Sequence, residues 1–194
     1  MTSSQMPPVD AAGVSLLRLD ALDANFSSDF DQYRDGILYV LSCSYASYHG
    51  NEYHLQRILS GQSIVYLALA QQTTVAVSYV KRNLRRGGTA VYPESYRGRG
   101  LAKALVIMSF VDFPEQYSIL ASSDVKMIRL LMNLGFVRAT SIEEVESVTK
   151  DEFRLLSAPI VTSEGVTFRR ASSTRNTDRE TLILLYRSCD ASLR

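Results

Sequence analysis

The sequence predicts a mixed α/β protein with a mainly antiparallel central sheet flanked by helices, and two observations support this. Three runs rich in β-branched and apolar residues follow one another over residues 63–70, 73–81 and 84–91, separated by short polar turns. After the third run, a turn with two glycines leads into an apolar helix. Strands joined by short turns pair in antiparallel fashion, and the strand, turn and helix that follow make the fold mixed.

A tail, a strand and two helices are expected before these three strands. Residues 1–13 are rich in Ser, Pro, Gln and Ala and predict a loose N-terminal tail. Residues 14–19 predict the first strand. A helix is expected from an N-cap at Ser27 or Ser28 to about residue 46, followed by a short helix over residues 52–59.

The elements after the glycine turn are expected to alternate between helix and strand. The helix from Leu101 is expected to run to Phe113, before Pro114, and a short strand to cover residues 117–121. The next helix is expected to begin at a cap formed by Ser123 or Asp124 and to end at Gly135. Its apolar stripe is predicted to contain Val125, Ile128 and Met132.

The C-terminal residues 149–194 are expected to form an extension. Residues 166–171 predict a strand, and residues 177–189 predict a capped amphipathic helix with Leu182, Leu185 and Cys189 on its buried side. This strand–helix extension either packs on the preceding domain or is a degenerate start of a second repeat.

The glycine turn has the composition of an anion-binding loop. Gly98 and Gly100 let the backbone approach a ligand closely, and the helix that follows directs free N–H groups and its positive dipole end at that ligand. Arg97, Arg99 and Lys103 add positive charge that suits phosphate. The turn lacks the Gly-Lys-Ser/Thr of a Walker loop and the three-glycine spacing of the dinucleotide fingerprint, so we interpret it as a pyrophosphate cradle of another kind.

Two sequence blocks resemble the GCN5-related N-acetyltransferase (GNAT) superfamily. Arg97-Gly98-Arg99-Gly100-Leu101-Ala102 matches Arg/Gln-x-x-Gly-x-Gly/Ala and follows a strand that ends in Val-x-Pro-Glu. Residues 124–136, from Asp124 to Gly135-Phe136, are similar to the Asn-x-x-Ala-x-x-Leu-Tyr-x-x-x-Gly-Phe helix of that family. The resemblance covers approximately residues 14–148.

The resemblance implies a GNAT-like acyl-CoA N-acyltransferase fold over residues 14–148, with acetyl-CoA (CoA) as the cofactor. It also implies that the strand over residues 117–121 splays away from the strand that ends at Val91, which opens a slot for the pantetheine arm. The residues expected to bind the cofactor are Val91, Tyr92, Arg97, Gly98, Arg99, Gly100, Leu101, Ala102, Lys103 and Asp124.

Acetyl transfer to an amine requires a polarised thioester, a neutral amine and a proton for the leaving thiolate. The backbone N–H groups of Val91 and Tyr92 are candidates for polarising the thioester, and Glu94 is the candidate base or an exposed turn carboxylate. The family's usual general acid is a Tyr at the position of Leu131, and leucine cannot donate a proton. Three alternatives remain: another group such as Tyr92, Tyr96 or Tyr117 donates the proton to the thiolate, water donates it, or catalysis has been lost.

Two further groups of residues could contact the acceptor. Tyr45, Tyr48 and Tyr53 predict either an aromatic corner between two helices or, as the resemblance implies, the wall of an acceptor pocket. Basic residues at positions 81, 82, 85 and 86 predict either a solvated turn or a patch for an acidic substrate or an RNA-like acceptor.

Composition narrows the class of protein further. The net charge of +1 over 194 residues argues against a general nucleic-acid binder. Two cysteines do not make a disulfide framework, and no metal-ligand spacing is present. No secretory signal and no run of membrane-spanning length is seen, so a cytoplasmic protein without a membrane partner is expected.

Three functional hypotheses follow. The first is an acetyl-CoA-dependent N-acetyltransferase that acts on a small-molecule or peptide/protein amine by direct attack in a ternary complex. The second is a CoA-binding module that has weak or no turnover. The third is an interaction protein whose C-terminal segment docks a partner or, in a homodimer, a second subunit. The sequence does not identify the acceptor.

Overall fold

The helices and strands divide between two units of the chain. The computed structural model describes residues 13–44, 51–121, 124–149, 159–169 and 181–188. Unit 1 comprises residues 1–83 and 87–112, and unit 2 comprises residues 84–86 and 113–194. None of the helices described is long and apolar enough to cross a membrane.

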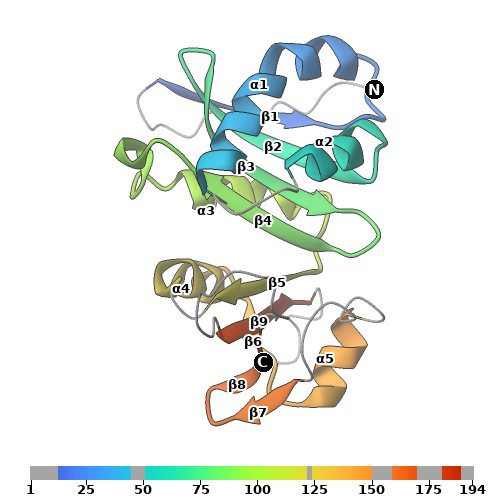
Figure 1. Ribbon diagram of the computed structural model, residues 1–194, viewed down its shortest axis with the longest axis vertical. Coiled ribbons are helices and arrows are strands. Elements are labelled where there is room, and N and C mark those ends of the chain that lie inside the picture. The colour runs from blue at the N-terminus through green and yellow to red at the C-terminus, as the bar shows by residue number, and fades with distance from the viewer. Residues whose placement is uncertain (1–12, 45–50, 122–123, 150–158, 170–180, 189–194) are drawn as a thin grey trace. The chain divides into compact units, whose positions relative to one another are not determined.

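Unit 1 is built around a sheet whose strand order is β1-β2-β3-β4 (Figure 1). β1 pairs with β2 in antiparallel fashion, with Val14 opposite Ala70. β2 pairs with β3 in the same way, with Ser63 opposite Lys81. The elements are β1 (Val14–Leu19), α1 (Phe26–Ser44), α2 (Asn51–Leu59), β2 (Ser63–Ala70), β3 (Thr73–Lys81), β4 (Arg86–Val91), the 3-10 turn η1 (Glu94–Tyr96) and α3 (Leu101–Ser109). The predicted first strand and antiparallel meander are confirmed.

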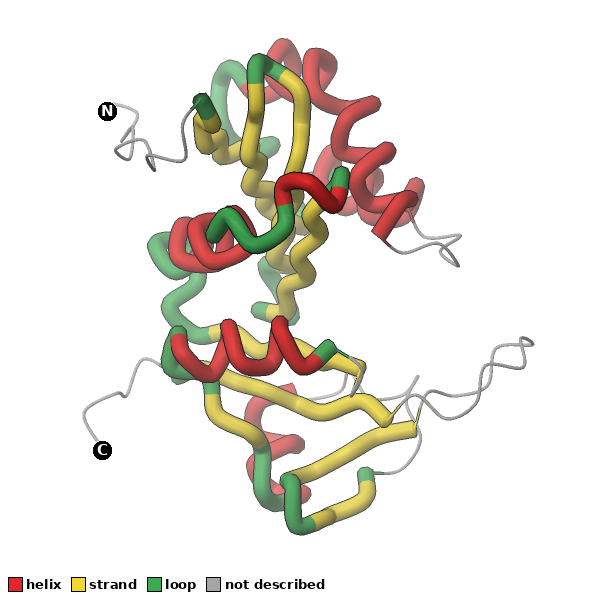
Figure 2. Tube along the Cα trace, turned by 90° about the vertical axis from the view of Figure 1, so that its left-hand side faces the viewer, coloured by secondary structure: helices red, strands yellow, loops and turns green. Residues whose placement is uncertain are grey.

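Helices cover both faces of this sheet, which explains why every residue of β2 is buried. Figure 2 shows α1 and α2 on one face of the unit 1 strands and α3 on the other. The core under α1 and α2 contains Phe30, Ile37 and Leu41 of α1 together with Val65 and Leu67 of β2. Burying this much apolar surface is the main source of stability for unit 1.

The helix boundaries differ from the predicted ones in two places. Helix α1 begins at Phe26, so Ser27 and Ser28 lie inside its first turn, and the Ser28 hydroxyl donates to the Asn25 carbonyl at 3.0 Å. Helix α3 ends at Ser109, whereas the sequence predicted that it would continue to Phe113. A proline excludes the helix from its own position, but it does not fix how many residues earlier the helix ends.

A partly buried cluster of charges ties the end of β1 to the residues that follow α3. The Arg18 guanidinium donates to Asp20 at 2.6 Å, to Asp23 at 2.7 Å and to both carboxylate oxygens of Asp112 at 3.0 and 3.1 Å. The Tyr66 hydroxyl on β2 donates to Asp112 at 2.7 Å. Burial and this hydrogen bond both raise the pKa of Tyr66, so its phenol stays protonated.

Asp20 extends the cluster to the end of β3. Its side chain is 4% exposed, and both of its carboxylate oxygens accept hydrogen bonds from Arg82 at 2.5 Å. Arg82 also donates to the Gly61 carbonyl at 2.9 Å. Burial alone would raise the pKa of Asp20. The hydrogen bonds from Arg82 and the Leu22 N–H, together with the positive charges of Arg82 and Arg18, outweigh burial and lower this pKa below 3.8. We refer to Arg18, Asp20, Tyr66, Arg82 and Asp112 as the charge cluster.

Unit 2 contains a second set of paired strands, in the order β5-β9-β8-β7, with β6 also paired to β9. Arg86, the first residue of β4, pairs in parallel with Tyr117 of β5, and the β5-β9, β9-β8 and β8-β7 pairs are antiparallel. The elements are β5 (Gln116–Ala121), α4 (Val125–Asn133), β6 (Val137–Arg138), α5 (Ile142–Thr149), β7 (Ile160–Thr162), β8 (Gly165–Arg169) and β9 (Thr181–Arg187). The mixed, mainly antiparallel fold class is therefore confirmed.

The predicted C-terminal helix is wrong over its described part, because residues 181–187 form strand β9. Leu182, Leu184 and Tyr186 face the core that also contains Val145 of α5, and Ile183 and Leu185 point to the opposite face. A strand that is buried on both faces is a continuous apolar run, which periodicity does not distinguish from a buried helix. The predicted strand near residue 166 is confirmed as β8 (Gly165–Arg169).

Helix α4 also buries a different stripe from the predicted one. Ile128 and Leu131 are buried, whereas Val125 and Met132 are 48% and 45% exposed. Asp124 caps the helix by accepting a hydrogen bond from the Met127 N–H at 3.3 Å. Gly135, at a φ of 88°, follows its end, as predicted.

We predict that Asp20→Asn destabilises the protein by about 3 kcal/mol at pH 7, because it removes the buried charge that two partly buried arginines share. The lowered pKa of Asp20 means that its stabilisation is complete above pH 3.8 and is lost as the pH falls further. The difference in the free energy of unfolding between wild type and Asp20→Asn, measured by urea denaturation, should therefore become smaller below pH 3.8. The matched control is Asp23→Asn, whose side chain is 55% exposed and whose loss should cost about 1 kcal/mol or less.

Candidate functional site

The loop between η1 and α3 is open at both of its glycines. Gly98 and Gly100 have φ values of 78° and 80°, in the left-handed region that other residues adopt only with strain. A Cβ atom built on either glycine would have no atom within 4 Å. Backbone conformation therefore requires glycine at these positions, and among the described residues none approaches the side-chain side of either glycine within 4 Å.

The N-terminus of α3 presents unpaired backbone donors to this loop. The first hydrogen bond of the helix runs from the Ala104 N–H to the Gly100 carbonyl at 2.9 Å, so the N–H groups of Leu101, Ala102 and Lys103 have no carbonyl within the helix. Gly100 provides no side-chain cap, and the first turn contains no acidic residue. The positive end of the helix dipole is thus uncompensated, which favours an anion.

The basic side chains of the loop have different environments. Arg97 donates to the Glu94 carboxylate at 2.8 Å and to the Val91 carbonyl at 3.3 Å, so it is held toward the end of β4. The Arg99 guanidinium lies 4.9 Å from the centre of the Tyr96 ring. Arg97, Arg99 and Lys103 are all exposed. These charges raise the local positive potential, while the backbone supplies the fixed donors.

The two backbone N–H groups predicted to polarise a thioester point to opposite edges of β4. The Tyr92 N–H donates to the Val75 carbonyl of β3 at 3.0 Å, so it is occupied within the sheet. Successive N–H groups of an extended strand alternate in direction, and the Val91 N–H therefore points away from β3. The Tyr92 N–H is therefore occupied and does not fit its predicted role, whereas the role of the Val91 N–H stays a prediction.

The Tyr92 side chain packs against Tyr39 of α1, a residue that the sequence analysis missed. The two ring centres lie 5.4 Å apart at an angle of 80°, and the Tyr39 side chain is 57% exposed. Hydrogen bonding to Tyr39 raises the pKa of Tyr92 above 10.0, and the neighbouring Cys43 adds to the effect. Tyr39 lies off the buried stripe of α1, and an exposed aromatic on an amphipathic helix was the available signal.

The other candidate catalytic side chains lie in contrasting surroundings. Glu94 is 78% exposed and forms an ion pair with Arg97. In unit 2, Tyr117 is 3% exposed and packs with Val166 and Phe168 in the core. Asp124, which caps α4, and Leu131 also belong to unit 2.

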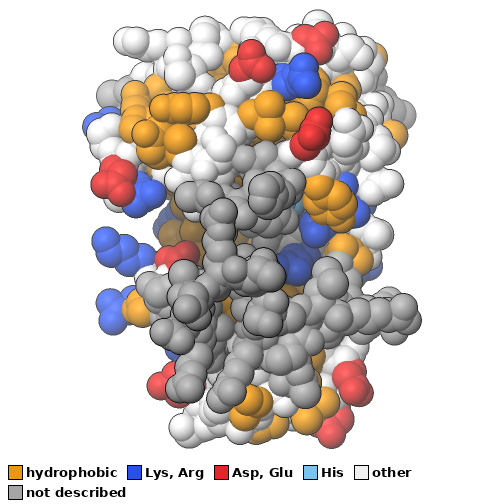
Figure 3. Space-filling model, in the orientation of Figure 1, with side chains coloured by type: hydrophobic (Ala, Val, Ile, Leu, Met, Phe, Trp, Pro, Cys, Tyr) orange, Lys and Arg blue, Asp and Glu red, His pale blue; other side chains and the backbone are white. Residues whose placement is uncertain are grey.

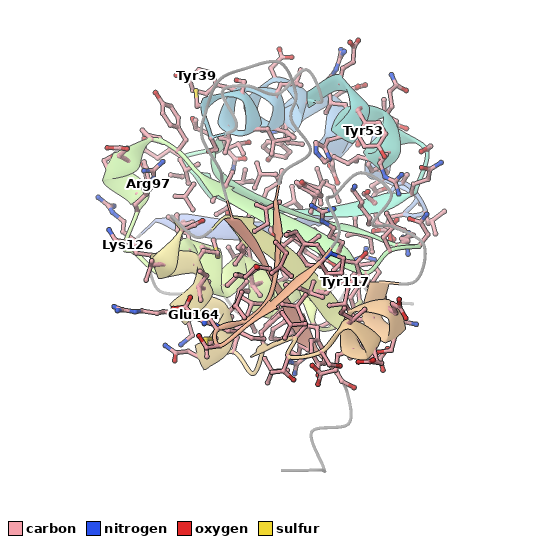
Figure 4. All side chains as sticks on the ribbon, turned by 60° about the horizontal axis from the view of Figure 1, so that its bottom comes forward. Tyr39, Tyr53, Arg97, Tyr117, Lys126 and Glu164 are labelled. Carbon is pink, nitrogen blue, oxygen red and sulfur yellow. The ribbon has the colours of Figure 1, made fainter. Side chains whose placement is uncertain are left out.

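Of the predicted acceptor residues, Tyr53 lies on α2 with 49% of its surface exposed. Figure 4 shows Tyr53 on the opposite side of unit 1 from Tyr39 and Arg97. Tyr45 and Tyr48 lie outside the described residues. Within the part of the chain that the structure describes, no group of three or more potential metal ligands is found.

Comparisons with known proteins give matches only among solved structures, since no family model and no curated protein matches this chain. A protein of Acinetobacter baylyi described as a candidate acetyltransferase superposes with a TM-score of 0.60 at 12% identity, covering 94% of this chain and 97% of the other. The ribosomal-protein-S18-alanine N-acetyltransferase of Escherichia coli superposes with a TM-score of 0.56 at 15% identity, covering 89% of this chain and 92% of the other.

A third similar structure is a GNAT-superfamily phosphinothricin acetyltransferase of Sinorhizobium meliloti, solved with acetyl-CoA. It gives a TM-score of 0.51 at 17% identity and covers 90% of this chain and 88% of the other. Identities this low establish the fold and not the activity. The order of elements, the glycine loop at the start of α3 and these superpositions together show that the chain has the fold of the GNAT superfamily.

Proposed function

We propose that this protein transfers the acetyl group of acetyl-CoA to an amine of a small molecule or a peptide. The observation that carries the proposal is the open glycine loop at the N-terminus of α3, with the uncapped N–H groups of Leu101, Ala102 and Lys103. An array of backbone donors at a helix N-terminus binds phosphate groups, and a pyrophosphate is the anionic part of CoA.

The residues present fit acetyl-CoA. The loop from Arg97 to Gly100 and the first turn of α3 would hold the pyrophosphate, and the Val91 N–H would donate to the thioester carbonyl. When bound, acetyl-CoA supplies an activated acetyl group. The slot expected between β4 and β5, and a role for Asp124 beside it, remain predictions.

The structural neighbours support the reaction class and a range of acceptors. One is solved with acetyl-CoA and is named for phosphinothricin, and another is named for an alanine of ribosomal protein S18. We propose the same reaction class for the present chain, with the acceptor amine attacking the thioester directly in a ternary complex. Holding the two reactants in line would supply roughly 7–11 kcal/mol of the barrier reduction.

We assign the proton donor to Tyr92 and the proton acceptor to Glu94. Tyr92 directly follows Val91, and its ring packs edge-to-face against that of Tyr39. Its raised pKa keeps the phenol protonated at neutral pH, which is the state that a general acid needs. Glu94 lies two residues further on and forms an ion pair with Arg97 at 2.8 Å. Tyr117 is the third candidate, although its burial also fits a purely structural role.

A second candidate function is a CoA-binding module with little or no turnover that acts through protein–protein interaction. The observation that favours it is Leu131, which takes the position of the usual general acid and is 4% exposed. Loss of a general acid costs about 10²–10⁴-fold in rate without abolishing cofactor binding. The two functions therefore share acetyl-CoA binding and differ in turnover.

The first test is calorimetric titration of acetyl-CoA into wild type, Gly100→Glu and Gly13→Glu. Gly100→Glu places a carboxylate in the open space before α3, so we expect at least a hundredfold loss of affinity from a micromolar wild-type value. Gly13→Glu is the matched control. Gly13 has a φ of 87°, similarly open surroundings and a position before β1, so this variant carries the same backbone strain and charge but should keep full affinity.

Equal affinity in wild type and Gly100→Glu would rule out the cradle. A wild type that does not bind acetyl-CoA would mean that the fold is kept while the cofactor is not used. Binding without release of the CoA thiol in the presence of amines would support the module without turnover.

We predict that Tyr92→Phe lowers kcat by roughly 10²-fold or more while the affinity for acetyl-CoA is unchanged, because only the proton donor is removed. The raised pKa of Tyr92 also predicts that wild-type kcat does not fall on the alkaline side until the pH exceeds 10.0. Tyr33→Phe is the control, since it removes a hydroxyl that bonds Gln72 at 2.8 Å elsewhere on α1. Unchanged kcat in Tyr92→Phe would transfer the role to another group.

A further inference from the structure

An exposed aromatic ring and an exposed carboxylate lie one helical turn apart on α1. Asp35 and Tyr39 are four residues apart in the helix, so they share one face and their Cβ atoms lie about 5–6 Å from each other. Asp35 is exposed, and Tyr39 is 57% exposed. In Figure 3, acidic and hydrophobic side chains lie at the surface in the upper part of unit 1, where Figure 1 places α1. We refer to Asp35 and Tyr39 as the α1 surface pair.

The α1 surface pair lies beside the end of β4. The Tyr39 ring meets the Tyr92 ring edge-to-face, with the ring centres 5.4 Å apart. Tyr92 directly follows Val91, and the Arg97 guanidinium donates to the Val91 carbonyl at 3.3 Å. Figure 4 shows Tyr39 and Arg97 on the same side of unit 1. One part of the Tyr39 ring therefore contacts the proposed proton donor, and the rest of the ring faces solvent.

The charges around the α1 surface pair favour a cation. None of the ion pairs between described residues involves Asp35, so no described cation neutralises its carboxylate. Arg34 precedes Asp35 but lies about 100° away around the helix. Arg97 of the glycine loop is already paired with Glu94 at 2.8 Å. The face of an aromatic ring attracts a cation, and the Asp35 carboxylate adds to this attraction.

A diamine supplies the cation that these two groups recognise. Its reacting amine must be neutral to attack a thioester, whereas its second amine stays protonated at neutral pH, because the pKa of an alkyl ammonium is about 10. This ammonium can lie over the free part of the Tyr39 ring and donate a hydrogen bond to Asp35. A monoamine of the same length has only a methyl group to place there. A carboxylate in the same position would be repelled by Asp35.

We propose that the α1 surface pair binds the second, protonated amine of the acceptor, so that the substrate class of this protein is the alkyl diamines. This inference rests on the proposed function, which places the reacting amine near Tyr92 and Glu94. Tyr39 then has two roles, since it packs against the proposed proton donor and also selects the acceptor.

Putrescine, pentylamine and δ-aminovalerate are matched probes. Each has a primary amine on the same alkyl chain, and they differ only in the other end, which is an ammonium, a methyl group or a carboxylate. The experiment measures release of the CoA thiol with each probe and gives the preference, which is the ratio of kcat/KM for putrescine to that for pentylamine. The probes differ in basicity and in number of amines, but these differences are the same for every variant. A change in preference between variants therefore reports the protein's own contribution.

The preference should fall by about threefold in Asp35→Asn, by about threefold in Tyr39→Leu and by about tenfold in the double variant, mainly through the KM for putrescine. Tyr39→Leu also disturbs the packing of Tyr92, but this lowers kcat for both amines and cancels in the preference. δ-Aminovalerate should be the poorest of the three acceptors in wild type and should improve in Asp35→Asn. Asp31→Asn is the matched control, because it removes an exposed carboxylate one turn earlier on α1, about 6 Å further from Tyr39, and should keep the wild-type preference.

A binding measurement decides the proposal even if no amine is acetylated. The ring signals of Tyr39 are identified in an NMR spectrum by their absence from Tyr39→Leu. Titration with putrescine in the absence of acetyl-CoA should shift these signals, whereas butanediol, its uncharged counterpart, should not. In Asp35→Asn the same shift should require about threefold more putrescine.

Four results would overturn the proposal. These are no shift with putrescine, equal shifts with putrescine and butanediol, an unchanged preference in the double variant, and an effect of Asp31→Asn as large as that of Asp35→Asn. The last result would mean that putrescine responds only to the general negative charge of α1. Failure of the proposed function is seen separately, as absent acetyl-CoA binding in calorimetry.

Discussion

The buried carboxylate of Asp20 is the constraint on which the arrangement of unit 1 depends. It lies between Arg18 of β1 and Arg82 at the end of β3, and Arg18 in turn holds Asp112. Because Asp112 follows α3, the charge cluster fixes one end of the helix whose other end forms the glycine loop. Removing one partner leaves an uncompensated charge in the interior, which costs more than the pair contributes. The candidate site therefore depends on ion pairs far from it in the sequence.

In the proposed cofactor site, the backbone would supply most of the contacts to the anion and the side chains would have supporting roles. Gly98 and Gly100 adopt left-handed conformations, and the first turn of α3 is uncapped. Arg97 is engaged by Glu94 and Val91, so its charge reaches the loop only at a distance. Fixed dipoles need no reorganisation when a ligand binds, whereas exposed arginines lose conformational freedom. This division explains how a short loop with few sequence requirements can serve as a phosphate site.

The position of the usual general acid is filled by a buried leucine, and two tyrosines of unit 1 offer an alternative. Leu131 contributes to the packing of α4, so its replacement by a proton donor would disturb that core. Tyr39 and Tyr92 come from different elements and meet beside the Val91 backbone. In the function proposed above, the acid is the Tyr92 phenol at the end of β4, packed against Tyr39 of α1.

Local signals in the sequence determined the first strand, the antiparallel meander, the glycine loop, the Asp124 cap and Gly135 at the end of α4. Each of these depends on alternation, turn residues or caps within a few neighbouring positions. Tertiary structure alone decided that residues 181–187 form β9, because their apolar run fits a buried strand and a buried helix equally well. It also decided the pairing of Asp20 with Arg82, of Tyr39 with Tyr92 and of Arg57 with Lys81 around Tyr53. These contacts join residues that are distant in the sequence, and local patterns do not specify which distant side chains meet.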